Sequence, residues 1–155
     1  MRVSVIGGGS ITDEQTTRAE ALGRELARRG HTVVCGGRGG TMEAVCRGAK
    51  AEGGQTIGIL PSSRRTEANP YVDVPIATGL GHARNALVPL NGDAVIALPG
   101  GAGTLTEIGF GAIFDRPLVS LGSHDIEDLG FEVVTVESPT AAVEAVDRLL
   151  EGGGE

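Results

Sequence analysis

The sequence has almost no aromatic residues and few cysteines. Its 155 residues include no Trp, one Tyr and three Phe, so a hydrophobic core has to be built from Val, Ile, Leu and Ala. The two cysteines, Cys35 and Cys46, lie in apolar patterns without a CxxC spacing. This arrangement excludes a disulfide scaffold and favours two buried, reduced thiols.

Long hydrophobic runs are also missing. No apolar run approaches the roughly 18 residues that a membrane-spanning helix requires. Met1 leads directly into the apolar segment 2–6, which leaves no room for a signal peptide. We therefore expect a cytoplasmic protein without a membrane partner.

Positive charge is scarce. The chain has 13 Lys and Arg residues against 20 Asp and Glu, which gives a net charge of −7, and Lys50 is its single lysine. This balance argues against non-specific binding to nucleic acids or to anionic membranes. A small phosphorylated ligand is still allowed, because its binding depends on local hydrogen-bond donors.

Glycine, in contrast, is abundant, with 26 residues that gather at the ends of short apolar runs. These runs alternate with segments of helical periodicity. They predict strands at 2–6, 32–35, 56–60, 72–78, 93–98, 117–122 and 131–136. Helices are predicted over about 13–29, from Met42, weakly over 79–90, from Leu105 and from Pro139.

Strands of nearly uninterrupted Val, Ile and Leu with helices between them are typical of a parallel sheet that is covered on both faces. We therefore predict a doubly wound, Rossmann-like α/β fold with a mostly parallel sheet of about seven strands. Residues 1–150 form one domain, and the tail 151–155 is expected to fray. Ser10 and Asp13 are spaced like a capping box that begins the first helix, and Ser138 is the expected N-cap of the last.

Glycine-bearing turns follow four of the predicted strands, as "GGGS" (7–10), "GGRGGT" (36–41), "TGLG" (78–81) and "GGAGT" (100–104). Ligands of open parallel sheets bind at this edge, where helix N-termini also favour anions. A bound phosphate is therefore the leading hypothesis. The candidate ligand-binding residues of these turns are Gly8, Gly9, Ser10, Gly36, Gly37, Gly39, Gly40, Thr41, Thr78, Gly79, Pro99, Gly100, Gly101, Gly103 and Thr104.

The common phosphate motifs are absent. There is no GxxxxGK(S/T), and "GGGSIT" lacks the third glycine of the dinucleotide motif, with Arg24 near the place of the ribose-binding acid. No zinc motif or nucleophile elbow is present, so no metal is predicted. His31 and His124 are expected in surface loops, and His82 is at most a neighbour of the site.

Three longer motifs, "GGRGGTMEAVCRGA", "TGLGHARNAL" and "PGGAGTLTEI", resemble the LONELY GUY phosphoribohydrolases, a Rossmann-like family also labelled possible lysine decarboxylases. "SVIGGG", "GGQTIGILP", "ANPYVD" and "TGLGHARN" are more similar to its short branch, which includes the molybdenum-cofactor carrier protein. The resemblance covers residues 2 to about 121. It implies a homodimer or homotetramer, a site along the glycine turns, and no metal or organic cofactor for catalysis.

The phosphoribohydrolases split a nucleoside 5′-monophosphate into a free base and ribose 5-phosphate, so a true lysine decarboxylase is not implied. By resemblance, Glu107 matches the final glutamate of their PGGxGTxxE motif, and Arg84 matches the arginine of an H-E-R-K sequence. Both are candidate catalytic residues and, with Asn85, candidate ligand contacts. A carboxylate can stabilise the positive charge that develops on the ribose or orient water, and an arginine can bind phosphate or base.

The chain departs from that family in several places. Asn85 stands where the enzymes have lysine, His82 and Ala83 replace H-E, and Thr106 replaces the first of two glutamates. These changes favour a non-catalytic binder or carrier of a nucleotide or a molybdopterin-type ligand. Phosphoribohydrolase activity is the alternative.

Simpler explanations exist for several of these residues. Glu107 is also favourable as a carboxylate in the first turn of a helix, and Arg84 could be an ordinary helix-surface arginine. Arg38 is either a phosphate contact or a turn residue, and Glu43 fits a helix start better than a catalytic role. The polar segment 61–70 is either a lid or plain surface.

Overall fold

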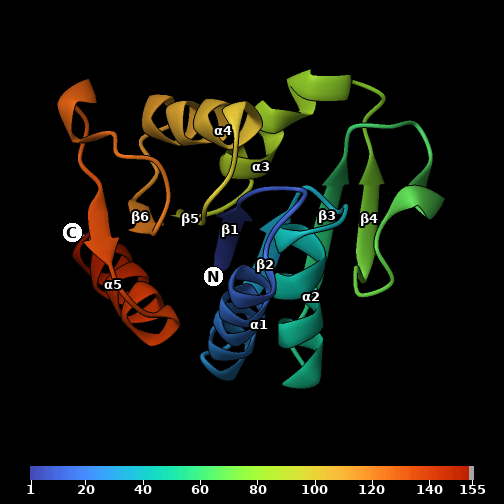
Figure 1. Cartoon of the computed structure of the whole chain (residues 1–155), viewed down its shortest axis with the longest axis horizontal. Helices are drawn as coiled ribbons and strands as arrows, with labels where there is room; N and C mark the ends of the chain where they lie inside the picture. The colour runs from blue at the N-terminus through green and yellow to red at the C-terminus, as the bar shows by residue number, and fades with distance from the viewer. Residues whose placement is uncertain (154–155) are drawn as a thin grey trace.

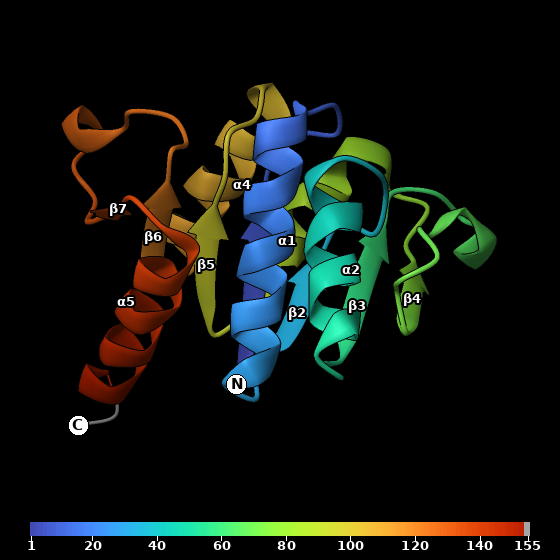
Figure 2. The same cartoon turned by 60° about the horizontal axis from the view of Figure 1, so that its bottom comes forward.

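The chain folds around one seven-stranded sheet in which each neighbouring pair of strands is parallel. The structure, a computed structural model, describes residues 1–153 apart from the side chain of residue 127. The strands lie in the order β4-β3-β2-β1-β5-β6-β7 (Figures 1 and 2). Their bounds are β1 Arg2–Ile6, β2 Thr32–Cys35, β3 Thr56–Leu60, β4 Val74–Ala77, β5 Ala94–Ala97, β6 Leu118–Leu121 and β7 Val134–Val136.

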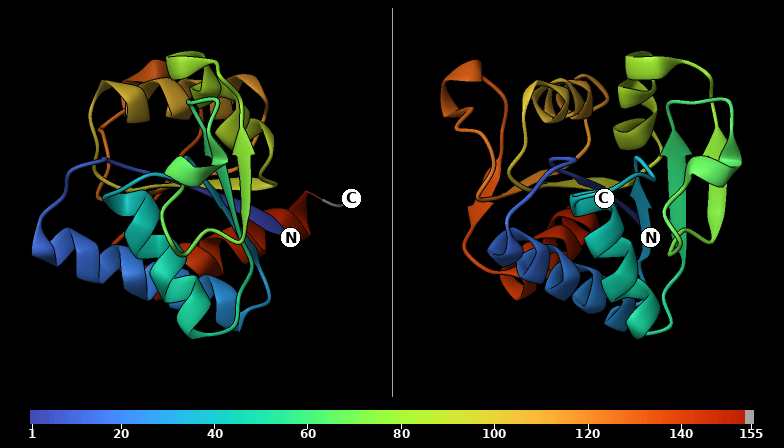
Figure 3. Two further views of the ribbon diagram at one scale, coloured as in Figure 1. Left: turned by 90° about the vertical axis from the view of Figure 1, so that its right-hand side faces the viewer. Right: turned by 45° about the vertical axis from the view of Figure 1, so that its right-hand side comes forward.

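Helices cover both faces of the sheet (Figures 1 and 3). One face carries α1 (Asp13–Arg28), α2 (Thr41–Ala51) and α5 (Pro139–Gly152). The other face carries the 3-10 helix η2 (Gly81–Ala86), α3 (Leu87–Leu90) and α4 (Ala102–Ile113). Two short 3-10 turns, η1 (Arg65–Glu67) and η3 (Glu127–Leu129), complete the described elements. The predicted doubly wound α/β fold is confirmed.

The strand order reverses between β1 and β5, which pair directly from Val3 opposite Ala94 to Ile6 opposite Ala97. Both strands are buried on both faces beyond Arg2, as their unbroken apolar sequences predicted. The turns after them diverge to α1 on one face and α4 on the other (Figure 3). This switch point is the expected ligand position of a doubly wound sheet.

Two glycines let α1 and α2 approach each other more closely than side chains would permit. A Cβ on Gly23 would overlap the backbone carbonyl of Val45, and a Cβ on Gly48 would overlap that of Glu20. Periodicity cannot reveal this contact, because it depends on how the two helices cross. The close approach fixes α1 against α2 below the glycine turns.

The predicted capping box of α1 is wrong by two residues. Thr12 is the N-cap: its hydroxyl accepts from the Gln15 amide at 3.2 Å, while Gln15 Oε1 accepts from the Thr12 amide at 3.0 Å. A longer Gln side chain completes the reciprocal bond, and this leaves Ser10 in the exposed turn before the helix. Ser138 caps α5 as predicted, accepting from the Ala141 amide at 3.1 Å.

Other element bounds also differ from the expectation. The helix predicted over 79–90 begins only at Gly81, as the 3-10 helix η2, and continues into α3. Pro89 lies within α3, at a position whose amide needs no intrahelical partner. Helix α5 continues through Gly152, so residues 151–152 belong to the helix and not to a tail. Residues 154–155 of the predicted tail lie outside the described residues.

His31 was expected in a surface loop, and this prediction is wrong. Its side chain is only 8% exposed, and Nε2 lies 2.7 Å from Oδ1 of Asp147 on α5. The tertiary contact with α5 covers a loop that looks exposed in the sequence. Cys35 and Cys46 are both buried free thiols, as predicted. Within residues 1–153, no helix is both long and apolar enough to cross a membrane.

Candidate functional site

Three of the predicted glycine turns are joined by backbone hydrogen bonds at the switch point. The Thr41 amide donates to the Gly8 carbonyl at 3.0 Å, and the Gly8 amide donates to the Pro99 carbonyl at 2.8 Å. Gly40 takes a positive φ of 63° at the start of α2, where a Cβ would overlap the backbone of Gly8 and Gly9. The glycines therefore serve first to bring three turns together, and the Gly8 amide is already occupied.

A cavity of about 200 Å³ opens between these turns and the helices η2 and α4. Nine predicted site residues share its lining: Gly8, Gly9, Gly36, Arg84, Asn85, Gly101, Gly103, Thr104 and Glu107. They come from four separate segments of the chain. The tertiary structure thus brings the two candidate catalytic residues and three of the glycine turns to one place.

The other predicted site residues lie outside this lining: Ser10, Gly37, Gly39, Gly40, Thr41, Thr78, Gly79, Pro99 and Gly100. Several of them support the turns. The hydroxyl of Thr78 donates to the Leu60 carbonyl at 2.6 Å, and the side chain of Thr41 fills the space that a Cβ on Gly7 would need. A Cβ on Gly100 would overlap Thr104 Oγ1, so this glycine permits a close turn.

Sequence reasoning missed four lining residues, namely Val5, Ile6, Gly7 and Met42. Gly7 stands in the quoted "GGGS" turn, so its position in the motif could have identified it. Met42 directly follows "GGRGGT", but its helical periodicity indicated only a core contact. Val5 and Ile6 carried no signal beyond a buried strand.

Arg84 is held on η2 by backbone carbonyls. Its Nη1 donates to Gly36 O at 2.6 Å and to Ile59 O at 2.9 Å, and its Nε is buried without a hydrogen-bond partner. A Cβ on Gly36 would collide with Nη1, so this glycine makes room for the guanidinium. Burial lowers the pKa of Arg84, and the nearby charge of Glu107 opposes that effect.

Glu107 faces the same cavity from α4 and is partly buried. Burial raises its pKa from 4.5 to about 8, although the positive charge of Arg84 acts in the other direction. The two side chains influence each other, yet no ion pair within 4 Å joins them among the described residues. Both side chains line the cavity without pairing with each other, so both can contact a ligand there.

The N-terminus of α4 lies at the cavity, which Gly101, Gly103 and Thr104 line. Gly101 is its N-cap and makes no side-chain capping bond. The first amides of a helix have no intrahelical acceptor, and here they belong to Ala102, Gly103 and Thr104. Together with the helix dipole they form a local positive end that suits an anion.

Asn85 and Thr106, both departures from the phosphoribohydrolase pattern, contact each other. Asn85 is 7% exposed and donates through Nδ2 to Thr106 Oγ1 at 3.2 Å. Thr106 in turn donates to the Gly103 carbonyl at 2.6 Å. A neutral hydrogen-bond chain therefore links η2, which carries Arg84, to the turn before Glu107.

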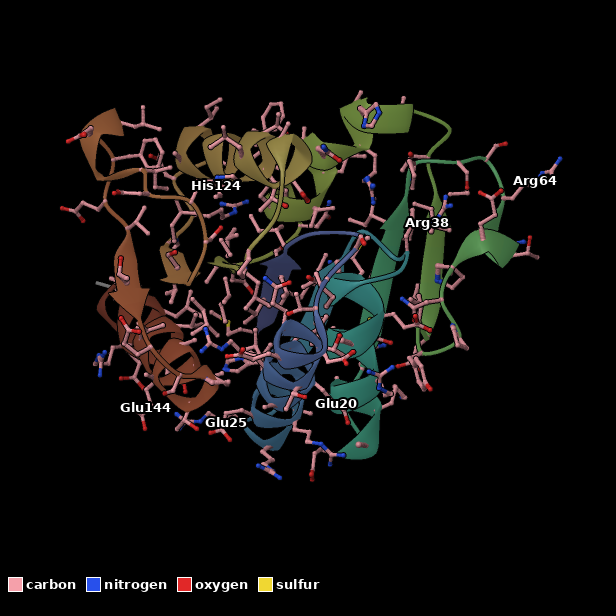
Figure 4. The ribbon with its side chains drawn as sticks, viewed as in Figure 1. Glu20, Glu25, Arg38, Arg64, His124 and Glu144 are labelled. Atoms are coloured by element: carbon pink, nitrogen blue, oxygen red, sulfur yellow. The ribbon has the colours of Figure 1, made fainter. Side chains whose placement is uncertain are left out.

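The remaining candidates lie around the margin of the site. Arg38 is exposed and lies 3.6 Å from the Glu67 carboxylate of η1, and His124 contacts the Gly101 carbonyl through Nε2 at 3.0 Å (Figure 4). His124 lies in a loop and is partly exposed, in agreement with the surface loop predicted for it. His82 lines the cavity, as its neighbouring position predicted. Within residues 1–153, no three His, Cys, Asp or Glu side chains gather into a metal-binding group.

Comparison with known proteins identifies a matching family, relatives by sequence and similar solved structures. A family model described as the SLOG cluster4 family matches residues 1–148. The cytokinin riboside 5′-monophosphate phosphoribohydrolase of Mycobacterium tuberculosis is 39% identical over 110 residues, which cover 69% of this chain and 57% of the relative. This chain therefore aligns with little more than half of that protein.

Two solved structures are similar over almost the whole chain. The molybdenum cofactor binding protein of Rippkaea orientalis superposes with a TM-score of 0.89 at 34% identity, covering 96% of both chains. The molybdenum cofactor carrier protein of Chlamydomonas reinhardtii gives a TM-score of 0.89 at 33% identity, covering 97% of this chain and 98% of its own.

Proposed function

The chain belongs to the SLOG cluster4 family, and on this premise we propose that it binds a nucleotide-type phosphorylated small molecule as a non-catalytic binder or carrier. The ligand phosphate lies at the first turn of α4, where three amides lack helical acceptors. The rest of the ligand lies between Arg84 and Glu107. The similarity to molybdenum cofactor carriers supports a nucleotide or a molybdopterin-type compound as the ligand.

The observation that carries this proposal is the unpaired placement of Arg84 and Glu107 in one cavity. Unsatisfied charged groups destabilise a folded protein unless a partner compensates them. Arg84 has a partly buried guanidinium with an unpartnered Nε, and Glu107 is buried enough to raise its pKa to about 8. A ligand that contacts both groups would compensate them.

The raised pKa of Glu107 fits a binding role. Because burial raises this pKa to about 8, a protonated form of the side chain is available near neutral pH. A protonated carboxyl group can donate a hydrogen bond to a phosphate or a carbonyl oxygen. The neutral Asn85–Thr106 pair likewise adds no charge to the site.

Phosphoribohydrolase activity is the second candidate, supported by the M. tuberculosis relative. In that reaction water adds to C1′ of the ribose while the N-glycosidic bond breaks, and the base leaves with a proton. A group with a pKa near 8 is suited to transfer such a proton close to neutral pH. Glu107 would be the residue responsible.

We also propose a cytoplasmic homodimer or homotetramer that acts without nucleic acid or a required cofactor. Exposed apolar side chains on the face of η2 and α4 support self-association. Leu80 is 53% exposed, Leu105 43% and Ile113 69%.

Native mass spectrometry of freshly purified protein tests the proposal most directly, because a co-purifying ligand identifies the chemistry. Calorimetric titration with AMP and with ribose 5-phosphate then measures binding. We expect Arg84→Gln to weaken binding by about tenfold or more, because a charge-assisted contact is lost. Free base is measured in the same samples, and no release above a Glu107→Ala control is expected.

Arg116→Gln is the matched control. Arg116 also donates to backbone carbonyls, those of Phe114 and Leu90, and also has a buried, unpartnered Nε, but it lies outside the cavity. It should leave the affinity unchanged. The binder proposal fails if neither probe binds and no ligand co-purifies. Glu107-dependent release of base would instead establish the hydrolase.

A further inference from the structure

The loop between β6 and β7 lies against the turn that begins α4. Strands β5 and β6 are parallel neighbours, so the turns at their carboxyl ends leave the sheet side by side. A Cβ on Gly122 would lie 3.8 Å from Cγ of Pro99, which shows how closely the two turns approach. Further along the loop, Ile126 is 5% exposed and belongs to the same hydrophobic cluster as Ile108 of α4. Packing therefore holds this loop beside the candidate site.

From this loop, the side chain of His124 reaches the backbone of α4. Its Nε2 lies 3.0 Å from the carbonyl oxygen of Gly101, the N-cap residue (Figure 4). A carbonyl oxygen only accepts, so Nε2 carries a proton and is the donor of this hydrogen bond. The same oxygen accepts from the Leu105 amide at 3.2 Å, in the first turn of the helix. The Gly101 carbonyl thus has a donor for each of its two lone pairs.

The Gly101 carbonyl belongs to the same peptide unit as the amide of Ala102. That amide is the first of those without a helical acceptor, to which we have assigned the ligand phosphate. Because the peptide unit is trans and planar, its N–H points away from its C=O. Hydrogen bonds to the carbonyl polarise the unit and strengthen its N–H as a donor. His124 therefore acts on this amide from the side opposite to the ligand.

The helices α1 and α5 begin in a different way. Thr12 at the start of α1 and Ser138 at the start of α5 each accept from an amide of the first turn. Gly101 has no side chain that could do so, and the first amides of α4 receive no capping bond from it. His124 contacts this helix start through a carbonyl instead, which leaves the amides open to a ligand.

We propose that His124 is a positioning residue of the phosphate site. It orients and polarises the peptide unit between Gly101 and Ala102, and the ligand phosphate accepts from the amide of that unit. His124 does not line the cavity, so it acts through the backbone and not by touching the ligand. The inference rests on the proposed function, which places the phosphate at the first turn of α4.

Substitution of His124 tests this role, with the full chain titrated calorimetrically with ribose 5-phosphate and with AMP. His124→Leu removes the donor, and we expect it to weaken the binding of both compounds about fivefold, because both carry the phosphate. His124→Gln keeps an N–H donor at the place of Nε2 and should bind both within about twofold of the parent chain. In NMR spectra recorded without ligand, the nitrogen resonance of the Ala102 amide should move upfield in His124→Leu and return in His124→Gln.

Ser123→Ala is the matched control. Ser123 precedes His124 in the same loop, and its buried Oγ has no hydrogen-bond partner in the described part of the chain. This variant should change neither the affinities nor the Ala102 resonance. Parental affinity in His124→Leu, equal losses in both His124 variants, or a loss confined to AMP would overturn this inference while the proposed function stands. If neither compound binds the parent chain, the phosphate site itself is refuted, and this inference fails with it.

Discussion

In the described part of the chain, charged side chains form ion pairs at one end of α1 but not at the other. At the end away from the glycine turns, Glu20 and Glu25 of α1 and Glu144 of α5 take part in ion pairs with arginines (Figure 4). At the end beside the turns, Glu14 and Arg18 have no such partner among the described residues. Across the sheet, Arg84 and Glu107 are likewise without an ion pair there.

This difference separates charges that support the fold from charges that are available to a ligand. Exposed ion pairs each contribute little, about 0 to 1 kcal/mol, but they leave no charge uncompensated. Glu14 is exposed, whereas Arg84 and Glu107 are partly buried. Partly buried charges without an ion-pair partner reduce stability, and they gather at functional sites. The charges beside the glycine turns are therefore available to the ligand that we propose, whereas the charges at the opposite end of α1 are compensated by one another.

The largest expected change in the free energy of unfolding comes from the close packing of α1 against α2. Gly48→Ala places a Cβ against the Glu20 carbonyl at the α1–α2 contact. We expect the free energy of unfolding to fall by about 3 kcal/mol, measured by urea denaturation. Gly109→Ala is the control in α4, where a Cβ meets open space, and it should stabilise by up to about 1 kcal/mol. Equal changes in both variants would contradict the close helix contact.

At the candidate site we expect a substitution to raise the free energy of unfolding, by a smaller amount. The pKa of Glu107 in the folded protein, about 8, exceeds the ordinary 4.5, so folding binds a proton and the stability falls as the pH rises from 4.5 to 8. Glu107→Gln removes this cost. We expect it to stabilise the protein by about 2 kcal/mol at pH 9 and by almost nothing at pH 4, measured by denaturation across this range. A gain that does not depend on pH would refute the raised pKa.

The smallest effect is expected at the paired charges of α5. Although burial opposes ionisation of Asp147, hydrogen bonds from Arg29 and His31 hold its pKa below 3.8. The resulting stabilisation is complete above that ordinary pKa and is lost as the pH falls through the lowered value. Asp147→Asn should cost about 1 kcal/mol at pH 7, and the difference should shrink on acidification. A variant as stable as the parent protein at pH 7 would show that this network contributes nothing.

The sequence predicted the sheet well because buried parallel strands are continuous apolar runs. Strands β1, β2 and β3 begin and end at the predicted residues, whereas β4, β5, β6 and β7 are each shorter than predicted. The resemblance to LONELY GUY-type proteins, including the molybdenum cofactor carriers, is confirmed by the family model and the solved structures. Capping was predicted less well, because Thr12 and Ser10 are equally plausible until the Gln15 side chain is placed.

The candidate site was predictable only in part. The glycines were predicted from their position at the carboxyl ends of strands, whereas Arg84 and Glu107 were predicted from the resemblance to the phosphoribohydrolase motifs. Sequence reasoning could not show that the Gly8 amide donates to the Pro99 carbonyl or that Arg84 donates to the Gly36 carbonyl. Nor could it show that Asn85 donates to the Thr106 hydroxyl. Each of these contacts joins segments that are distant in the sequence.

The sequence by itself determined the alternation of strands and helices, the position of the glycine turns and the family, because these depend on local patterns. The tertiary structure alone decided which charges are paired and which are free. It did so because pairing depends on the crossing of α1 with α2 and α5 and on the distances across the switch point. Across the switch point, no ion pair joins Arg84 to Glu107 among the described residues, although both line one cavity.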